Sequence, residues 1–266
     1  MFEIFIGLIF LGVFAGLLSG FFGIGSGVIL VPAYVFLFNY LNFPAEVIPL
    51  LATGTSMTTM ALTLPVASYT HYKNGKVNFS FAKKMVLVAF LATLFGRYLA
   101  LFMESQTLQQ IIAISLILAA VQIAFDFKPN RKSSSTGILE LILVSGIIGM
   151  ITSFVGIGGG ILLVPYFTYK GLSMHEAIGT SSIMGFSIAV AGATGAFFFN
   201  PAEAQELSFV IGSAYIPAVL VAGLTSMYFA RLGANISANT ESNMLKQAFA
   251  ILVIIAALRV FYITYI

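Results

Sequence analysis

Long apolar segments that are almost free of charged side chains limit the folds open to this chain more than any other feature. Charged residues make up only 8% of its 266 residues, whereas about a quarter is usual for soluble domains. Inside a lipid bilayer every backbone N–H and C=O group needs a partner within the protein, which favours helices. The sequence therefore predicts an all-α polytopic membrane protein without a soluble domain of any size.

The number of crossings follows from segment length, since a helix needs about 20 apolar residues to cross the hydrocarbon core. Suitable segments lie near 46–70, 79–102, 108–126, 137–155, 175–199, 208–230 and 243–264. A further stretch, Ile4 to Leu41, would be about 57 Å long as a helix, too long for one crossing and short for two. Its counterpart, Ile138 to Tyr169, poses the same problem. We expect each to be a helical hairpin or broken helix.

A duplicated glycine-rich phrase interrupts both of these long stretches. "GLLSGFFGIGSGVILVP" begins at Gly16, and "GMITSFVGIGGGILLVP" begins at Gly149. The phrases lie half a chain length apart and predict an internal repeat. We divide the chain into a first repeat at 1–128, a connecting loop at 129–136 and a second repeat at 137–266.

The distribution of basic residues indicates how the two repeats are oriented. If each half has five elements, the second half is inverted, and most basic residues fall on the cytoplasmic side, as the positive-inside rule expects. These are Lys73, Lys76, Lys83, Lys84, Lys128, Arg131, Lys132, Lys170, Arg231 and Lys246. If each half has four elements, the copies are parallel and the last three of these residues move outside. We therefore expect about ten segments in two inverted five-element repeats, with both termini outside.

The glycine phrases and two later Gly-Thr-Ser phrases, "ATGTS" and "AIGTSS", suggest a binding site for an anion. Unwound glycine backbone lets N–H groups approach a ligand closely, and a helix that starts there carries partial positive charge. Matching interruptions in two inverted halves typically mark the central site of a transporter. The candidate substrate-binding residues are Gly23, Gly25, Ser26, Gly27, Thr55, Ser56, Gly156, Gly158, Gly159, Gly160, Thr180 and Ser181.

A second interpretation of these residues is helix packing. Small residues allow helices to approach closely in membranes, and Ser or Thr can bond back to their own helix. Packing is the more common role for any one of them, whereas the repetition of four phrases in register favours a ligand. The glycine spacing fits neither a dinucleotide-binding fingerprint nor a phosphate-binding P-loop.

Few ionisable residues lie in the apolar segments. Arg97, about a turn from the outer end of its segment, is either a counter-charge for a substrate or, more commonly for such residues, a snorkelling side chain. Glu46 and Glu176 fall at helix starts, where a carboxylate complements the helix dipole. We interpret His71 and His175 as solvated loop residues without metal partners.

The two glycine phrases, "ATGTS", "AIGTSS", "HYKNGKV" and "YIPAVLVAGLTSMYFARLGANI" resemble the TauE/SafE family of sulfite-exporter-like permeases, also called the 4-toluene sulfonate uptake permease family. The resemblance spans nearly the whole chain. It implies a multi-pass protein of the inner membrane that moves a small inorganic or organic sulfur oxyanion, such as sulfite, a sulfonate or sulfoacetate. Alternating access is the expected mechanism, and an anion channel built on the same central site is the alternative. No enzyme motif, cofactor, metal or nucleic-acid partner is expected.

Overall fold

The computed structural model describes residues 2–104, 106–108, 110–111, 114, 137–199, 204, 207–245, 247–248 and 251. Six described helices are long and apolar enough to cross a membrane. The all-α polytopic membrane fold is thus confirmed, and the inverted repeat stays a prediction. The helices are α1 (Phe2–Phe22), α2 (Gly27–Tyr40), α3 (Ile48–Lys73), α4 (Phe79–Ala100), α6 (Ile138–Val155), α7 (Gly160–Tyr169), α8 (Met174–Phe198) and α9 (Ile216–Asn239).

Both long apolar stretches are broken at their predicted glycines. In the first, α1 ends at Phe22 and α2 begins at Gly27, and in the second, α6 ends at Val155 and α7 begins at Gly160. The intervening segments, 23–26 and 156–159, are called the first and second break below. Four glycines in the breaks have a positive φ, namely Gly23, Gly25, Gly156 and Gly159. Glycine adopts this conformation without the steric cost that other residues meet.

One predicted segment begins too early. The stretch 208–230 was expected to be helical throughout, but residues Val210–Ile211 (β1) and Ala214–Tyr215 (β2) form a short antiparallel hairpin, and α9 begins only at Ile216. Gly212, with φ +67°, makes the turn, and a proline stands in the first turn of α9. The predicted segments 108–126 and 243–264 and the loop 129–136 fall almost wholly outside the described residues.

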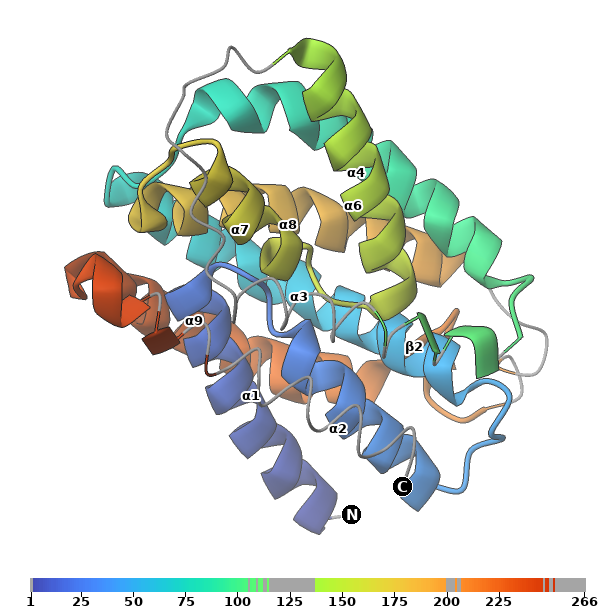
Figure 1. The fold of residues 1–266 in the computed structure, drawn as a ribbon. Helices are drawn as coiled ribbons and strands as arrows, with labels where there is room; N and C mark the ends of the chain where they lie inside the picture. The colour runs from blue at the N-terminus through green and yellow to red at the C-terminus, as the bar shows by residue number, and fades with distance from the viewer. Residues whose placement is uncertain are drawn as a thin grey trace.

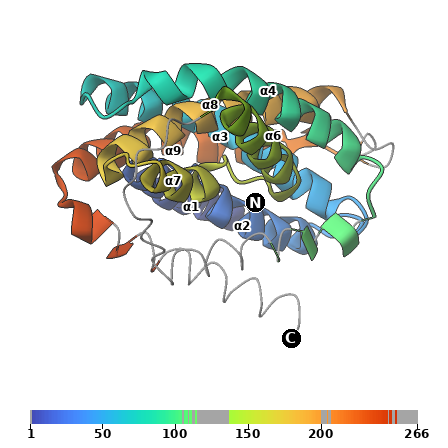
Figure 2. The ribbon, with the colours of Figure 1, turned by 45° about the horizontal axis from the view of Figure 1, so that its top comes forward.

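Helices α3 and α8 form the centre of the fold and are the most buried of the six long helices. They pack side by side and run in opposite directions across the middle of Figure 1. Helix α9 packs on α3 and α1, while α4 packs on α8 and α6. Figure 2 shows α4 and α8 on one side of α3, with α1 and α2 on the other. The third element of each half thus contacts the other half along its length.

Small residues let the outer helices approach these neighbours closely. A methyl group added to Gly16 of α1 would lie 2.4 Å from the carbonyl oxygen of Ser226 in α9. In the other half, a methyl group on Gly149 of α6 would lie 2.6 Å from the carbonyl oxygen of Ala89 in α4. Close backbone contact of this kind is a principal source of helix association in lipid. Part of the predicted packing role of the duplicated phrase therefore lies in α1 and α6, before the breaks.

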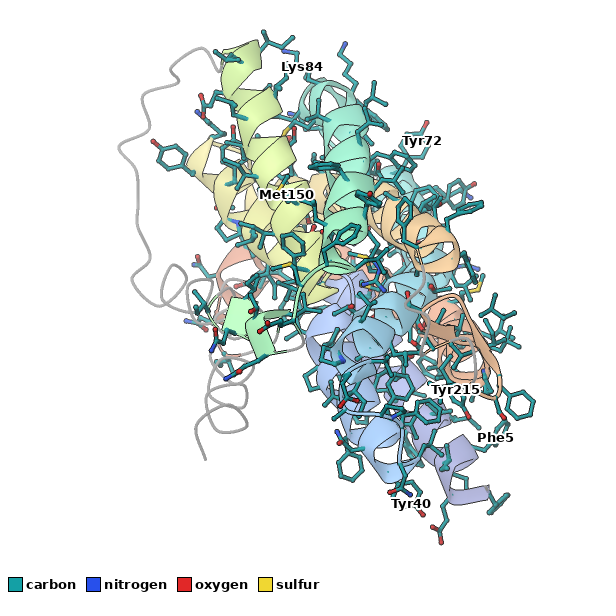
Figure 3. All side chains as sticks on the ribbon, turned by 90° about the vertical axis from the view of Figure 1, so that its right-hand side faces the viewer. Phe5, Tyr40, Tyr72, Lys84, Met150 and Tyr215 are labelled. Carbon is teal, nitrogen blue, oxygen red and sulfur yellow. The ribbon has the colours of Figure 1, made fainter. Side chains whose placement is uncertain are left out.

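The two ends of the molecule differ in their side chains. Tyr72 and Lys84 lie at the opposite end from Tyr40 and Phe5 in Figure 3. At the first end, Lys170 forms an ion pair with Glu140 at 2.5 Å. At the other end, the rings of Phe38 and Phe43 stack on each other, and Tyr215 of the β1–β2 hairpin contacts both edge to face.

The helix-start role predicted for Glu176 is observed. Ser173 Oγ accepts a hydrogen bond from the N–H of Glu176, and the Glu176 carboxylate accepts one from the N–H of Ser173, which together form a capping box. Glu46 instead lies in the turn before α3, whose N-cap is Val47 without a side-chain bond.

We expect Ser173→Ala to lower the stability of the protein by about 1 kcal/mol, because the first turn of α8 loses its cap. Thermal unfolding in detergent measures the change. Ser80→Ala serves as a control, since Ser80 uses only its backbone N–H to bond the N-cap residue Asn78. An unchanged unfolding temperature for Ser173→Ala would contradict the assigned cap.

Candidate functional site

The two breaks pack directly against each other at the centre of the protein. A methyl group added to Gly158 would lie 3.3 Å from the Cα atom of Gly25. One added to Gly27 would lie 2.2 Å from the carbonyl oxygen of Gly156, and one added to Gly160 would lie 2.1 Å from the Cα atom of Ile24. At Gly27 and Gly160 a side chain is therefore excluded by the backbone of the other break. We call it the crossing of the breaks.

Two helix N-termini meet at the crossing. Helices α2 and α7 both begin there, at Gly27 and Gly160. The first N–H groups of a helix have no partner within that helix, and the aligned peptide dipoles place about half a positive charge at this end. The crossing therefore combines two partial positive charges with glycine-rich backbone.

Ser56 and Ser181 of the Gly-Thr-Ser phrases reach the crossing, each from the other half. Ser56 Oγ donates a hydrogen bond to the Gly156 carbonyl oxygen at 2.8 Å, and Ser181 Oγ donates to the Gly23 carbonyl oxygen at 3.0 Å. Both hydroxyl protons are engaged by backbone carbonyls, so these serines hold the breaks in shape in this conformation. Each half thus fixes the break of the other half.

Thr55 and Thr180 lie beside these serines in sequence but bond to different elements. Thr55 Oγ1 accepts a hydrogen bond from the N–H of Tyr215 in β2 at 3.0 Å. Thr180 Oγ1 accepts one from the N–H of Asn78, the N-cap residue of α4, at 2.9 Å. The structure thus separates the threonines from the breaks and places them at opposite ends of the α3 and α8 pair.

Ser26 is the one predicted hydroxyl in the breaks whose side chain is unused. It is the N-cap residue of α2 and is 2% exposed, yet its Oγ has no hydrogen-bond partner. The corresponding N-cap of α7 is Gly159, which has no side chain. A buried hydroxyl without a partner costs free energy unless a ligand or water satisfies it. Ser26 is therefore available to a ligand at the crossing.

Arg97 is completely buried, so the interpretation as a snorkelling side chain is wrong. Its Nη1 donates to Thr53 Oγ1 at 2.7 Å, and its Nη2 donates to the Leu50 carbonyl oxygen at 2.8 Å and to Ser213 Oγ at 2.6 Å. Glycines make the room for it, since a methyl group on Gly195 would lie 2.6 Å from its Cγ. The side chain is held inside the protein because three oxygens from α3 and the hairpin turn face it there.

The charge of Arg97 has no compensating anion among the described residues. All three of its acceptors are neutral, its Nε has no partner, and no described carboxylate lies within ion-pair distance. The guanidinium is close to the second break, because a methyl group on Gly156 would lie 2.9 Å from the Cα atom of Thr53. Thr53 thus contacts both the buried cation and the second break.

The prediction that both histidines lie in loops is also wrong. Helix α3 ends at Lys73, three residues beyond the predicted segment 46–70, and α8 begins at Met174, one residue before the predicted segment 175–199. His71 is buried in α3 and hydrogen bonds the Gly20 carbonyl oxygen through Nε2 at 2.8 Å, while His175 bonds the Thr240 carbonyl oxygen at 2.9 Å. Within the described part of the chain, no cluster of three His, Asp or Glu side chains could hold a metal ion.

The sequence did not point to Thr53, Ser213 or Met60 as part of the site. Thr53 and Ser213 anchor Arg97, and Met60 lies between the breaks, where its Sδ would be 2.7 Å from a methyl group on Gly25. The signal for Thr53 was its place in the phrase "ATGTS", and the signal for Met60 was its place one helical turn after Ser56. Ser213 carried no signal, because its turn was predicted to be helical.

Comparisons with known proteins agree with a membrane transporter. The family described as "Sulfite exporter TauE/SafE" matches residues 8–260. A probable membrane transporter protein of Haemophilus influenzae is 29% identical over 98% of this chain and 99% of its own length. Another from Methanocaldococcus jannaschii is 26% identical over 86% of this chain and 85% of its own length. No solved structure matches significantly.

Proposed function

Because the chain belongs to the TauE/SafE family and is a membrane transporter, we propose that it carries small sulfur-containing oxyanions across the inner membrane by alternating access. Sulfite, short sulfonates and sulfoacetate make up the proposed substrate class. The cargo is bound at the crossing of the breaks.

The observation that carries this proposal is the pairing of two helix N-termini with a buried cation that has no carboxylate partner among the described residues. Oxyanions bind well at helix N-termini, because several N–H groups converge on them there. Arg97 supplies a full positive charge next to the second break, and Ser26 supplies an unused hydroxyl in the first. The free-energy cost of burying the Arg97 charge is expected at a functional site, where the anionic substrate itself serves as the counter-ion.

The cargo would be bound by groups of both halves. The candidate ligands are the backbone N–H groups at Gly25, Ser26 and Gly27 and at Gly158 and Gly160, with Arg97 as the counter-charge. The Gly159 N–H donates to the Ile157 carbonyl oxygen and shapes the second break. Gly23 and Gly156 shape the breaks through their left-handed backbone. The hydrogen bonds from Ser56 and Ser181 to the break carbonyls would form in some states of the transport cycle and break in others.

Alternating access would exploit the reciprocal contacts at the two ends. Thr55 is bonded to the start of α9 at one end, and Thr180 is bonded to the start of α4 at the other. In an inverted repeat, opening one of these contacts while the other stays closed exposes the crossing to one side at a time. All residues of both breaks are buried here, which corresponds to a closed state.

Flux of sulfite in proteoliposomes tests the proposal. We expect saturable uptake that is accelerated by unlabelled sulfite trapped inside, since exchange is typical of a carrier. Gly158→Ala should reduce uptake about tenfold, the equivalent of 1.4 kcal/mol, because its methyl group would lie between 3.1 and 3.3 Å from Ile24, Met60 and Gly25.

Gly146→Ala is the matched control, since a methyl group on that glycine of α6 meets only Val88, at 3.7 Å. Its uptake should equal that of the unmodified protein. Uptake without saturation or exchange would favour the anion channel over the carrier. Absence of flux for sulfite and for short sulfonates alike would overturn the proposed function.

A further inference from the structure

The Met60 side chain lies against both breaks at their crossing. It belongs to α3 and is fully buried. Its Sδ would lie 2.7 Å from a methyl group on Gly25 and 3.2 Å from one on Gly158, so the thioether faces the central glycine of both breaks at once. Ser56 of the same helix also reaches the second break, but through a hydrogen bond to the Gly156 carbonyl oxygen. Met60 therefore fills the space next to the two peptide segments that are proposed to bind the anion.

The repeat shows that this side chain is not required by the architecture. Met60 stands six residues after Gly54 of the first Gly-Thr-Ser phrase, and Gly185 stands six residues after Gly179 of the second. A methyl group on Gly185 would lie 2.7 Å from the Gly158 carbonyl oxygen, so α8 approaches the second break with its backbone. On the α8 side, the helix backbone at Gly185 thus packs directly on the second break. At the matching position on the α3 side, the flexible Met60 side chain lies against the breaks instead.

We infer that Met60 determines how large the non-polar part of the transported anion can be. This inference rests on the proposed function, because it takes the crossing as the site of the anion. The N–H groups and Arg97 contact the charged oxygens, which leaves the sulfur substituent to face the thioether. Methionine suits this role, because it is apolar and unbranched and can adapt to a small ligand by rotation about three bonds. With Met60 present, the site accepts sulfite or a sulfonate with a very short tail and excludes an aromatic one.

Competition in proteoliposomes tests the inference, with sulfite, methanesulfonate and benzenesulfonate as the probes. In the unmodified protein, sulfite and methanesulfonate should inhibit labelled sulfite uptake far more strongly than benzenesulfonate. In Met60→Gly, inhibition by benzenesulfonate relative to sulfite should rise by about tenfold, the equivalent of 1.4 kcal/mol. The ratio of the two inhibitors is the readout, because a general loss of folded protein lowers uptake without changing it.

Met57→Ala is the matched control. Met57 lies one turn earlier in α3 and is equally buried, but its Sδ faces Gly192 of α8. Its inhibitor ratio should equal that of the unmodified protein. If Met60→Gly does not fold, Met60→Ala replaces it and should shift the ratio in the same direction. An unchanged ratio in a Met60 variant that still carries sulfite would overturn the inference alone, whereas an unmodified protein that carries no probe would overturn the proposed function with it.

Discussion

Replacing Arg97 by methionine is expected to abolish saturable sulfite uptake while leaving the protein folded. The substitution keeps a long side chain in the space beside Gly54 and Gly195 but removes the buried charge. If the guanidinium is the counter-charge of the anion, uptake should fall by about 100-fold, the lower end of the loss that follows when one preorganised donor to an oxyanion is removed in an enzyme. Initial rates in proteoliposomes measure the effect.

The folded state should tolerate this change, because the acceptors of Arg97 keep other partners. Thr53 Oγ1 also donates to the Pro49 carbonyl oxygen at 3.0 Å, and Ser213 Oγ also donates to the Ala196 carbonyl oxygen at 3.2 Å. Replacing a buried charge by an apolar group also removes a desolvation cost and is often neutral or stabilising. We therefore expect the unfolding temperature of Arg97→Met in detergent to stay the same or rise.

Two further variants separate the charge from its geometry. Arg97→Lys keeps the charge but cannot bond three oxygens in the plane of a guanidinium, so it should retain part of the uptake. Arg231→Met removes an exposed arginine of α9 and should leave uptake unchanged. Normal uptake by Arg97→Met would show that the buried cation serves the fold and is no part of the anion site.

The helix breaks could be predicted from the sequence because their cause is local. Glycines at Gly23, Gly25, Gly156 and Gly159 adopt left-handed backbone that other residues rarely adopt, and their repetition in two apolar stretches exposed the pattern. Segment length and the scarcity of charge are also local properties, and they predicted α3, α4, α6 and α8 to within a few residues. The hairpin before α9 was missed, because its short apolar strands resemble the start of a helix.

The destinations of polar side chains could not be predicted in the same way. Arg97 is buried because Leu50, Thr53 and Ser213 converge on it from two other elements. His71 is buried because α1 presents the Gly20 carbonyl oxygen to it. A local pattern does not encode which carbonyl of a distant helix will lie nearby, so the default expectation of an exposed or snorkelling group was wrong at both positions.

The second large effect is expected at Gly160, the first residue of α7. A methyl group there would lie 2.1 Å from the Cα atom of Ile24 and 2.7 Å from the Gly23 carbonyl oxygen. Both are backbone atoms, so no side chain can rotate away, and the two breaks must separate. We expect Gly160→Ala to destabilise the protein by about 3 kcal/mol, the upper part of the range for overpacked cores, with loss of sulfite uptake. Thermal unfolding in detergent measures the destabilisation.

Gly146→Ala separates this effect from the general consequence of adding a methyl group to a glycine. Gly146 lies in the same half, within α6, and has room for the methyl group. The change should therefore stabilise the helix by up to about 1 kcal/mol. The methyl group of Gly158→Ala has more space than that of Gly160→Ala. The unfolding temperature of Gly158→Ala should therefore lie between those of Gly160→Ala and Gly146→Ala. This order follows only if the breaks stay in contact in the folded protein. A Gly160→Ala variant as stable as the unmodified protein would show that the crossing is not maintained, and the anion site built on it would have to be abandoned.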